Sequence, residues 1–252
     1  LKAWRARKAQ RLPPFFAVAD PSLLSRVAEN FGLEVPLAVA TPETATKMFD
    51  AALPVVALGH EINVIAGQPD KANAPAIIES IERAVAGVAQ GSARGVVTNP
   101  IAKATLYAAG FKHPGHTEFL GELATRHYGE VYRAVMMLWA EELAVVPITI
   151  HIPLIDAPKK LTRELIIETG VIVAHDLATR FGITKPRLAF SGLNPHAGED
   201  GYLGREEIDT ITPAIEAARA RGWQVSGPYP ADTLFQPKYL KDADCMLAMY
   251  HD

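Results

Sequence analysis

The stretch "FFAVADPSLLSRVAENFG", residues 15–32, contains a complete strand-to-helix unit. Its five apolar residues at 15–19 favour a short buried strand. Asp20 then supplies a helix N-cap, Pro21 suits the first helical position, and Gly32 ends the helix. The stretch therefore predicts one strand followed directly by one helix.

The same alternation recurs along the chain. Helical patterns cover residues 73–90, 100–109, 117–129, 162–181 and 205–221, and strand-like runs cover residues 95–98, 187–192 and 245–251. Two further apolar runs, 134–140 and 143–151, are joined by Glu141 and Glu142 and predict a hairpin. Strands that alternate with long helices are typical of an α/β fold with largely parallel sheets flanked by helices.

Bulk composition excludes several classes of protein. The chain has 252 residues, 49% of them apolar, and a net charge of −3, which provides no basic field for nucleic acid or an anionic membrane. The single cysteine, Cys245, excludes an intramolecular disulfide and a CxxC zinc site. Neither a signal peptide nor an apolar run of membrane-spanning length is visible, so we expect a cytoplasmic protein. The sequence also has no GxGxxG, Walker A, GxSxG or HExxH motif.

Three of the eight histidines lie where predicted strands end. His151 ends one apolar run, His196 follows another, and His251 ends the last one. In open α/β sheets, ligands bind at the carboxyl edge of the strands, and three imidazoles are a common divalent-metal set. The alternative is three unrelated histidines bonded to backbone carbonyls, because the spacing carries no metal motif.

Residues 113–118, "HPGHTE", precede a predicted helix, which places His116 near the N-cap and Thr117 in the first turn. The positive end of the helix would suit a phosphate, although capping alone also explains these residues. "VTNPIAK", residues 97–103, has a similar design, and Lys103 could supply a second anion contact.

Acidic residues near the last motifs have simpler explanations. The spacing of Glu199, Asp200, Glu206 and Glu207 does not match an EF-hand loop. Glu206, Glu207 and Asp209 fit better as first-turn residues that complement a helix dipole. Asp232 could orient a metal-binding histidine, but the sequence by itself favours an Asx-turn.

Six motifs, taken together and in order, carry a family resemblance. They are "PGHTEF" (114–119), "HIPL" (151–154), "GLNPHAGE" (192–199), "EEIDTI" (206–211), "PADTLFQPKYL" (230–240) and "AMYHD" (248–252). With these motifs the sequence closely resembles the 4-hydroxythreonine-4-phosphate dehydrogenase family, over residues 14–252.

The resemblance implies a two-domain fold like that of isocitrate and isopropylmalate dehydrogenases. The Gly, Pro and His content around residues 110–117 predicts the boundary there, which gives domains at 1–115 and 116–252. It implies oxidation of 4-phosphooxy-L-threonine with NAD or NADP, followed by decarboxylation, in vitamin B6 biosynthesis. It also implies a homodimer with a shared active site. A glycine-rich segment before Leu1, and a segment after Asp252 that supplies a lysine, an asparagine and an arginine, would complete the first domain.

The resemblance also assigns site residues. His151, His196 and the partner subunit's His251 would bind one divalent ion, either zinc, magnesium or cobalt, and His116 and Thr117 would bind the substrate. Pro195 and Gly198 would hold His196 in place, and Asn194 and Glu199 are candidates for its support. No residue of the sequence is assigned as the proton acceptor, for which a lysine beyond Asp252 is one candidate.

Two alternatives remain open at the level of sequence. One is a related dehydrogenase that acts on 4-phospho-D-threonate or 4-phospho-D-erythronate. The other is a zinc hydrolase that uses the three histidines to activate water.

Overall fold

The computed structural model describes residues 1–113 and 115–251, and the chain divides into two compact units, Leu1–Ala134 and Val135–Asp252. Pro114 and Asp252, which belong to two of the quoted motifs, lie outside the described residues. The division falls later in the chain than the sequence-based boundary at 115/116. The reason is that α6 (His116–Tyr128) packs on α4 (Ala74–Ala89), with Phe119 and Leu123 against Ile81 and Val85.

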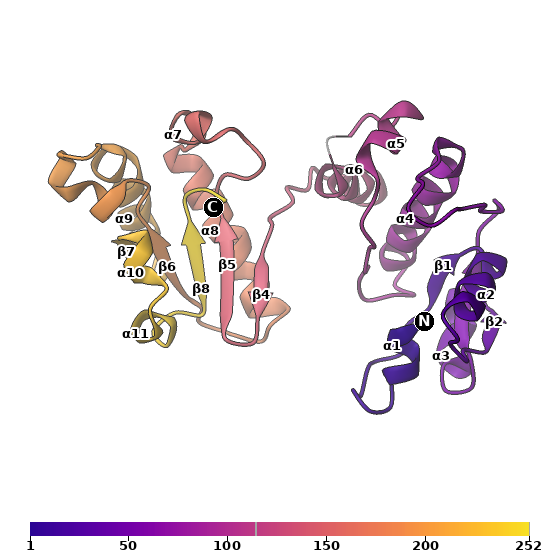
Figure 1. The fold of residues 1–252 in the computed structure, drawn as a ribbon. Helices are drawn as coiled ribbons and strands as arrows, with labels where there is room; N and C mark the ends of the chain where they lie inside the picture. Colours follow the sequence, from indigo (N-terminus) through magenta and orange to yellow (C-terminus); the bar gives the residue numbers. More distant parts are fainter. Residues whose placement is uncertain (114, 252) are drawn as a thin grey trace. The chain divides into compact units, whose positions relative to one another are not determined.

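The first unit contains a parallel three-stranded sheet in the order β1-β3-β2 (Figure 1). Its strands are β1 (Ala17–Ala19), β2 (Leu37–Val39) and β3 (Leu53–Ala57), and its remaining helices are α1 (Lys2–Ala6), α2 (Pro21–Asn30), α3 (Pro42–Met48), η1 (Lys71–Asn73) and α5 (Lys103–Ala108). The unit predicted from residues 15–32 is confirmed, since Asp20 accepts a 2.8 Å hydrogen bond from the Ser22 amide at the start of α2.

Two segments of this unit differ from the sequence-based expectation. The central strand β3 was not predicted, although its Val55 is completely buried. Conversely, the strand predicted at 95–98 is wrong: these residues join no sheet, and the Val97 side chain is 99% exposed. A strand needs a partner for its backbone groups, and a short run of β-branched residues cannot specify that partner.

The second unit contains a five-stranded sheet in the order β4-β5-β8-β6-β7. Its strands are β4 (Leu138–Ala140), β5 (Leu143–Pro147), β6 (Arg187–Ser191), β7 (Gln224–Tyr229) and β8 (Cys245–Ala248). The β4–β5 pair is antiparallel, which confirms the predicted hairpin, and every other neighbouring pair is parallel. The prediction of largely parallel sheets is therefore confirmed.

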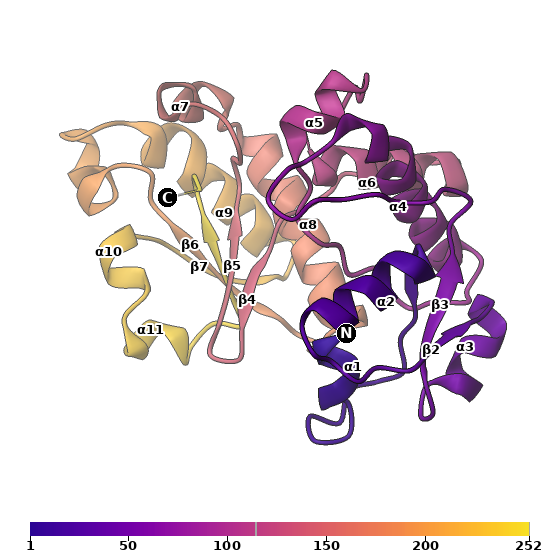
Figure 2. The same ribbon diagram turned by 45° about the vertical axis from the view of Figure 1, so that its right-hand side comes forward.

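Helices cover both faces of this sheet (Figure 2). The helices of this unit are η2 (Leu154–Asp156), α7 (Ala157–Lys160), α8 (Arg163–Thr179), η3 (Pro195–Gly201), η4 (Glu207–Ile211), α9 (Thr212–Ala220), α10 (Ala231–Leu234) and α11 (Pro237–Leu240). Of these, α8 and α9 pack on one face of the sheet and α10 and α11 on the other. Leu188 and Phe190 of β6 face the cluster formed with α8 and α9, while Ala189 between them faces Leu234 of α10. This alternation follows from the pleat of a strand that is buried on both sides. Within the described residues, no helix combines the length and apolar character needed to cross a membrane.

Candidate active site

The carboxyl ends of β5, β8 and β6 lie side by side, because β8 is inserted between the other two strands (Figure 1). Buried hydroxyls join these three ends just past the regular ladder. Thr149 Oγ1 donates a 2.8 Å hydrogen bond to the Met249 carbonyl, and Ser191 Oγ accepts a 3.3 Å bond from the Met249 amide. The three segments that continue to the predicted metal histidines are thus fixed relative to one another.

His151 and His251 meet at this edge. Their ring centroids are 5.4 Å apart with an interplanar angle of 43°, and both side chains are exposed. The backbone of His151 has a φ of 51°, a left-handed conformation that is unusual for a residue other than glycine. Two imidazoles bound to one tetrahedral zinc ion by bonds of about 2.0–2.1 Å would have ring centres roughly 5 Å apart. The observed spacing therefore fits two ligands of one ion.

His196 lies on the neighbouring loop, after β6, and is also exposed. Five consecutive residues of this loop are left-handed, with φ values of 52°, 53°, 82°, 43° and 54° from His196 to Asp200. Each of the four that are not glycine costs roughly 1–2 kcal/mol in this conformation. Backbone strain of this kind persists only where the surrounding structure enforces it, and it is concentrated at functional sites.

The Glu207 side chain of η4 is bonded to the residues that lead into this left-handed segment. This carboxylate is 3% exposed and accepts hydrogen bonds from the backbone amides of Leu193 and Asn194 at 2.7 and 2.8 Å. It also accepts a 2.9 Å bond from Asn194 Nδ2, which bonds to Glu206 as well. The sequence placed Glu207 at a helix dipole, so its role in the loop was missed; its motif "EEIDTI" was the available signal.

Within residues 1–113 and 115–251, no three His, Cys, Asp or Glu side chains converge closely enough to hold a metal ion. The structure thus pairs His151 with His251 and places His196 at the same sheet edge without joining it to the pair. Asp232 is exposed in the first turn of α10, where it accepts a 3.4 Å hydrogen bond from Thr233. Glu199, one of the two proposed supports of His196, is also exposed, whereas Asn194 has the contacts described above.

The start of α6 forms a second group of polar side chains, in the first unit. Gly115 is the N-cap and provides no side-chain cap, while His116 and Thr117 occupy the first two helical positions. The Nε2 atom of His116 is buried without a hydrogen-bond partner among the described residues. A methyl group on Gly115 would lie 3.4 Å from Lys103 Nζ, so the lysine of "VTNPIAK" reaches this helix start. The two motifs that suggested anion binding therefore converge.

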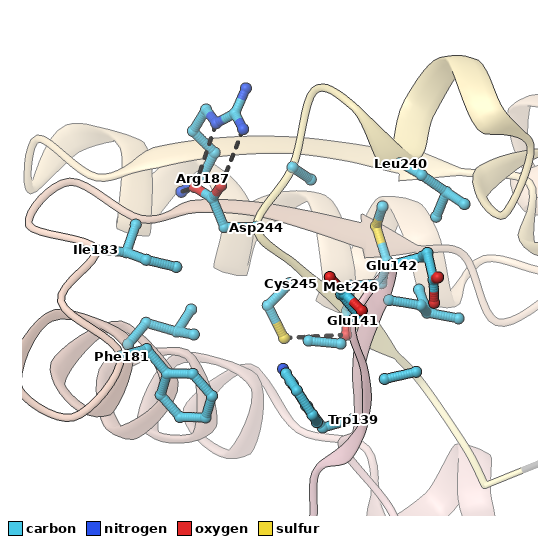
Figure 3. Close-up of a pocket in the computed structure, with 15 residues that line it drawn as sticks. Trp139, Glu141, Glu142, Phe181, Ile183, Arg187, Leu240, Asp244, Cys245 and Met246 are labelled. Carbon is cyan, nitrogen blue, oxygen red and sulfur yellow. Dashed lines mark hydrogen bonds and ion pairs between the residues drawn. The ribbon is translucent and has the colours of Figure 1, made fainter. Parts of the chain in front are cut away.

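A pocket of about 310 Å³ lies at the opposite, amino-terminal ends of β5, β6 and β8 (Figure 3). Trp139 and Phe181 line it, and Arg187 and Asp244 form an ion pair at its margin with an N–O distance of 2.9 Å. The hydrogen bond from Arg187 holds the pKa of Asp244 below its usual value. Burial raises the pKa of the Cys245 thiol to about 12, so this cysteine is neutral and unreactive at physiological pH.

Comparison with known proteins gives a consistent result. The chain is 49% identical over 260 residues to a 4-hydroxythreonine-4-phosphate dehydrogenase of Bradyrhizobium diazoefficiens, with all of this chain and 75% of the relative covered. It is 50% identical over 254 residues to one of Methylorubrum populi, with all of this chain and 73% of the relative covered.

Solved structures agree with these relatives. The structure of a 4-hydroxythreonine-4-phosphate dehydrogenase from Burkholderia phymatum matches with a TM-score of 0.85 and 32% identity, covering all of this chain and 75% of that one. A terephthalate dihydrodiol dehydrogenase from Burkholderia xenovorans, at 24% identity and a TM-score of 0.64, shares the fold. Fold and relatives together define an oxidoreductase of the isocitrate dehydrogenase-like class.

The family model described as pyridoxal phosphate biosynthetic protein PdxA matches residues 11–252. The chain belongs to this family, and its place is therefore in the biosynthesis of vitamin B6. The resemblance inferred from the six motifs is confirmed.

Proposed function

We propose that this protein oxidises 4-phosphooxy-L-threonine with NAD or NADP to 2-amino-3-oxo-4-phosphooxybutanoate, which loses carbon dioxide to give 3-amino-2-oxopropyl phosphate. The observation that carries the proposal is the adjacency of β5, β8 and β6, whose carboxyl ends lead to His151, His251 and His196. The names of the relatives support the choice of substrate.

His151, His196 and His251 are the proposed ligands of one divalent ion, either zinc, magnesium or cobalt. When bound, such an ion would lower the pKa of the substrate hydroxyl and stabilise the negative charge that develops on decarboxylation. The nicotinamide would supply the two-electron acceptor. The chain's own contribution is to hold three imidazoles at one edge, on segments joined by the Thr149 and Ser191 hydrogen bonds.

His116 and Thr117 are the proposed substrate-binding residues. The first turn of α6 has backbone N–H groups without a side-chain cap, and the positive end of the helix dipole favours a phosphate. The Nε2 of His116, which has no hydrogen-bond partner in the described part of the chain, offers a further polar contact, and Lys103 adds a positive charge nearby. These groups would bind and orient the phosphorylated end of the substrate.

The proposal includes a cytoplasmic homodimer in which the partner subunit's His251 completes each site. The pairing of His151 with His251 in one chain also allows a site built from a single chain. These two arrangements make different predictions for the activity of mixed dimers.

One experiment separates the candidate functions. Purified protein, with each divalent ion, is offered 4-phosphooxy-L-threonine, 4-phospho-D-threonate or 4-phospho-D-erythronate, and NADH production is followed. We expect turnover of the first compound, and loss of both turnover and bound metal in His196→Ala. Turnover of the sugar acids alone would replace the substrate, and metal-dependent phosphate release without NAD reduction would indicate a hydrolase.

A further inference from the structure

Glu207 is a buried carboxylate whose hydrogen bonds all lead to one loop. Its Oε1 atom accepts from two successive backbone amides, those of Leu193 and Asn194, and its Oε2 atom accepts from the Asn194 side chain. No Lys, Arg or His of the described chain forms an ion pair with it. Burying a carboxylate without a cation is unfavourable unless hydrogen bonds compensate, and the three donors from residues 193 and 194 provide that compensation.

The backbone of the loop is shaped around this carboxylate. A methyl group on Gly198 would lie 2.6 Å from Glu207 Oε2, and one on Gly192 would lie 3.0 Å from Oε1. Gly198 also has a φ of 82°, which disfavours any other residue. Glycine at both positions is thus required for the chain to approach Glu207 this closely.

Asn194, which Glu207 holds, is followed by Pro195 and then by the left-handed segment that begins at His196. The Asn194 carbonyl accepts a 3.1 Å bond from the Ala197 amide, which begins the left-handed turn. Left-handed turns of ordinary residues are not stable by themselves. The position of the His196 imidazole therefore depends on where Asn194 is held.

We infer that Glu207, acting through Asn194, is the positioning residue for His196 and thereby sets the affinity of the histidine site for a divalent ion. The inference rests on the proposed metal site, but it concerns a residue that would not touch the metal. Groups that orient metal ligands typically change metal affinity about 10- to 100-fold when they are removed.

The test compares Glu207→Gln with a matched control, Asp209→Asn. Both change one carboxylate of η4 to an amide, but the Asp209 side chain is exposed and accepts its hydrogen bonds from Arg205, not from residues 193 and 194. The affinity of each protein for Zn²⁺ or Co²⁺ is measured by competition with a chelator, together with the Co²⁺ absorption spectrum. We expect roughly 10- to 100-fold weaker binding for Glu207→Gln, and an affinity within about twofold of wild type for Asp209→Asn.

Two further variants make the outcome decisive. Glu207→Asp keeps the charge but shortens the side chain, so weaker metal binding in a variant with a native circular dichroism spectrum indicates geometry and not charge. Glu207→Asp also replaces Glu207→Gln in this comparison if the Glu207→Gln protein does not fold. His196→Ala is the reference: unchanged metal binding in it would refute the proposed site and not the anchoring.

Hydrogen exchange of the amides at 193–200 tests the anchoring without metal. We expect faster exchange in this segment for Glu207→Gln and not for Asp209→Asn. The inference is overturned if His196→Ala weakens metal binding while Glu207→Gln and Glu207→Asp bind as wild type does. If the wild-type protein binds no metal, the inference is overturned when the amides at 193–200 exchange hydrogen at the same rate in Glu207→Gln as in wild type.

Discussion

The two edges of the five-stranded sheet are built from the same strands but differ in how their polar groups are satisfied. At the amino-terminal edge, Arg187 and Asp244 join β6 to the start of β8 with several hydrogen bonds, and Cys245 is buried beside them. At the carboxyl edge, His151, His196 and His251 are exposed, and one of the loops is held in a left-handed conformation.

The difference shows how an α/β sheet separates stability from function. At the amino edge, Arg187 and Asp244 pair with each other, which leaves these two side chains little capacity for a ligand. The carboxyl edge instead uses buried groups, Glu207, Thr149 and Ser191, to hold exposed imidazoles in place. Substitutions at the first edge should therefore affect stability, and substitutions at the second should affect metal binding and turnover.

The largest effect is expected at the carboxyl edge. His151→Ala and His251→Ala should each lower NAD-dependent turnover on the order of 10³-fold, because a bound cation contributes several kcal/mol to the barrier. Arg187→Gln, at the amino edge, should keep its turnover. Steady-state kinetics at saturating metal measures all three, and equal losses at both edges would contradict the separation.

Mixing the two inactive variants sharpens this prediction. If the partner subunit's His251 completes each site, unfolding and refolding an equal mixture of His151→Ala and His251→Ala should restore roughly a quarter of wild-type activity, since about half of the dimers are mixed and each has one intact site. If each chain builds its own site from its own His151 and His251, no activity returns.

The next effect concerns the left-handed loop. Gly198→Ala should destabilise the second unit by about 2–3 kcal/mol, because it adds backbone strain and a contact with Glu207. Gly182→Ala is the matched control: its φ of 75° is similar, but a methyl group there meets nothing within 4 Å. Urea unfolding measures both, and equal losses would show that the approach to Glu207 carries no cost.

A smaller effect is expected at the amino edge. Asp244→Asn should lower the free energy of unfolding by about 1 kcal/mol, a value reduced by solvent because the Arg187 side chain is 43% exposed. Urea unfolding at neutral pH measures it, with NAD-dependent turnover expected to stay at the wild-type level. A loss of turnover larger than the loss of stability would count against separate roles for the two edges.

The smallest expected effect is that the difference in unfolding free energy between wild type and Asp244→Asn depends on pH. Because Arg187 lowers the pKa of Asp244 in the folded state, the ion pair contributes its full stability above the unfolded pKa, usually 3.8. That contribution is lost as the pH falls through the lower, folded-state pKa. The gap in unfolding free energy between wild type and Asp244→Asn should therefore be larger at about pH 7 than at about pH 3. A gap that does not change with pH would remove ionisation as its cause.

Local pattern alone determined much of this protein. Asp20 and Pro21 begin α2 as predicted, Gly129 ends α6 in a left-handed conformation, and the hairpin at Glu141 and Glu142 forms. Each of these features depends on hydrogen bonds between residues a few positions apart, so the sequence contains all the information required. The same is true of the placement of the three histidines after apolar runs, although β5 and β8 end at Pro147 and Ala248, before those runs do.

Tertiary structure decided the rest. Residues 95–98 and 53–57 are both short, apolar and β-branched, yet only the second pairs, because strand edges offer the same backbone groups to any partner and long-range packing selects among them. The insertion of β8 between β5 and β6 brings His251 to His151, and the burial of Glu207 beneath the His196 loop is equally non-local. A residue's type shows that it can bind a metal or carry a charge, but its neighbours exist only after the chain has folded.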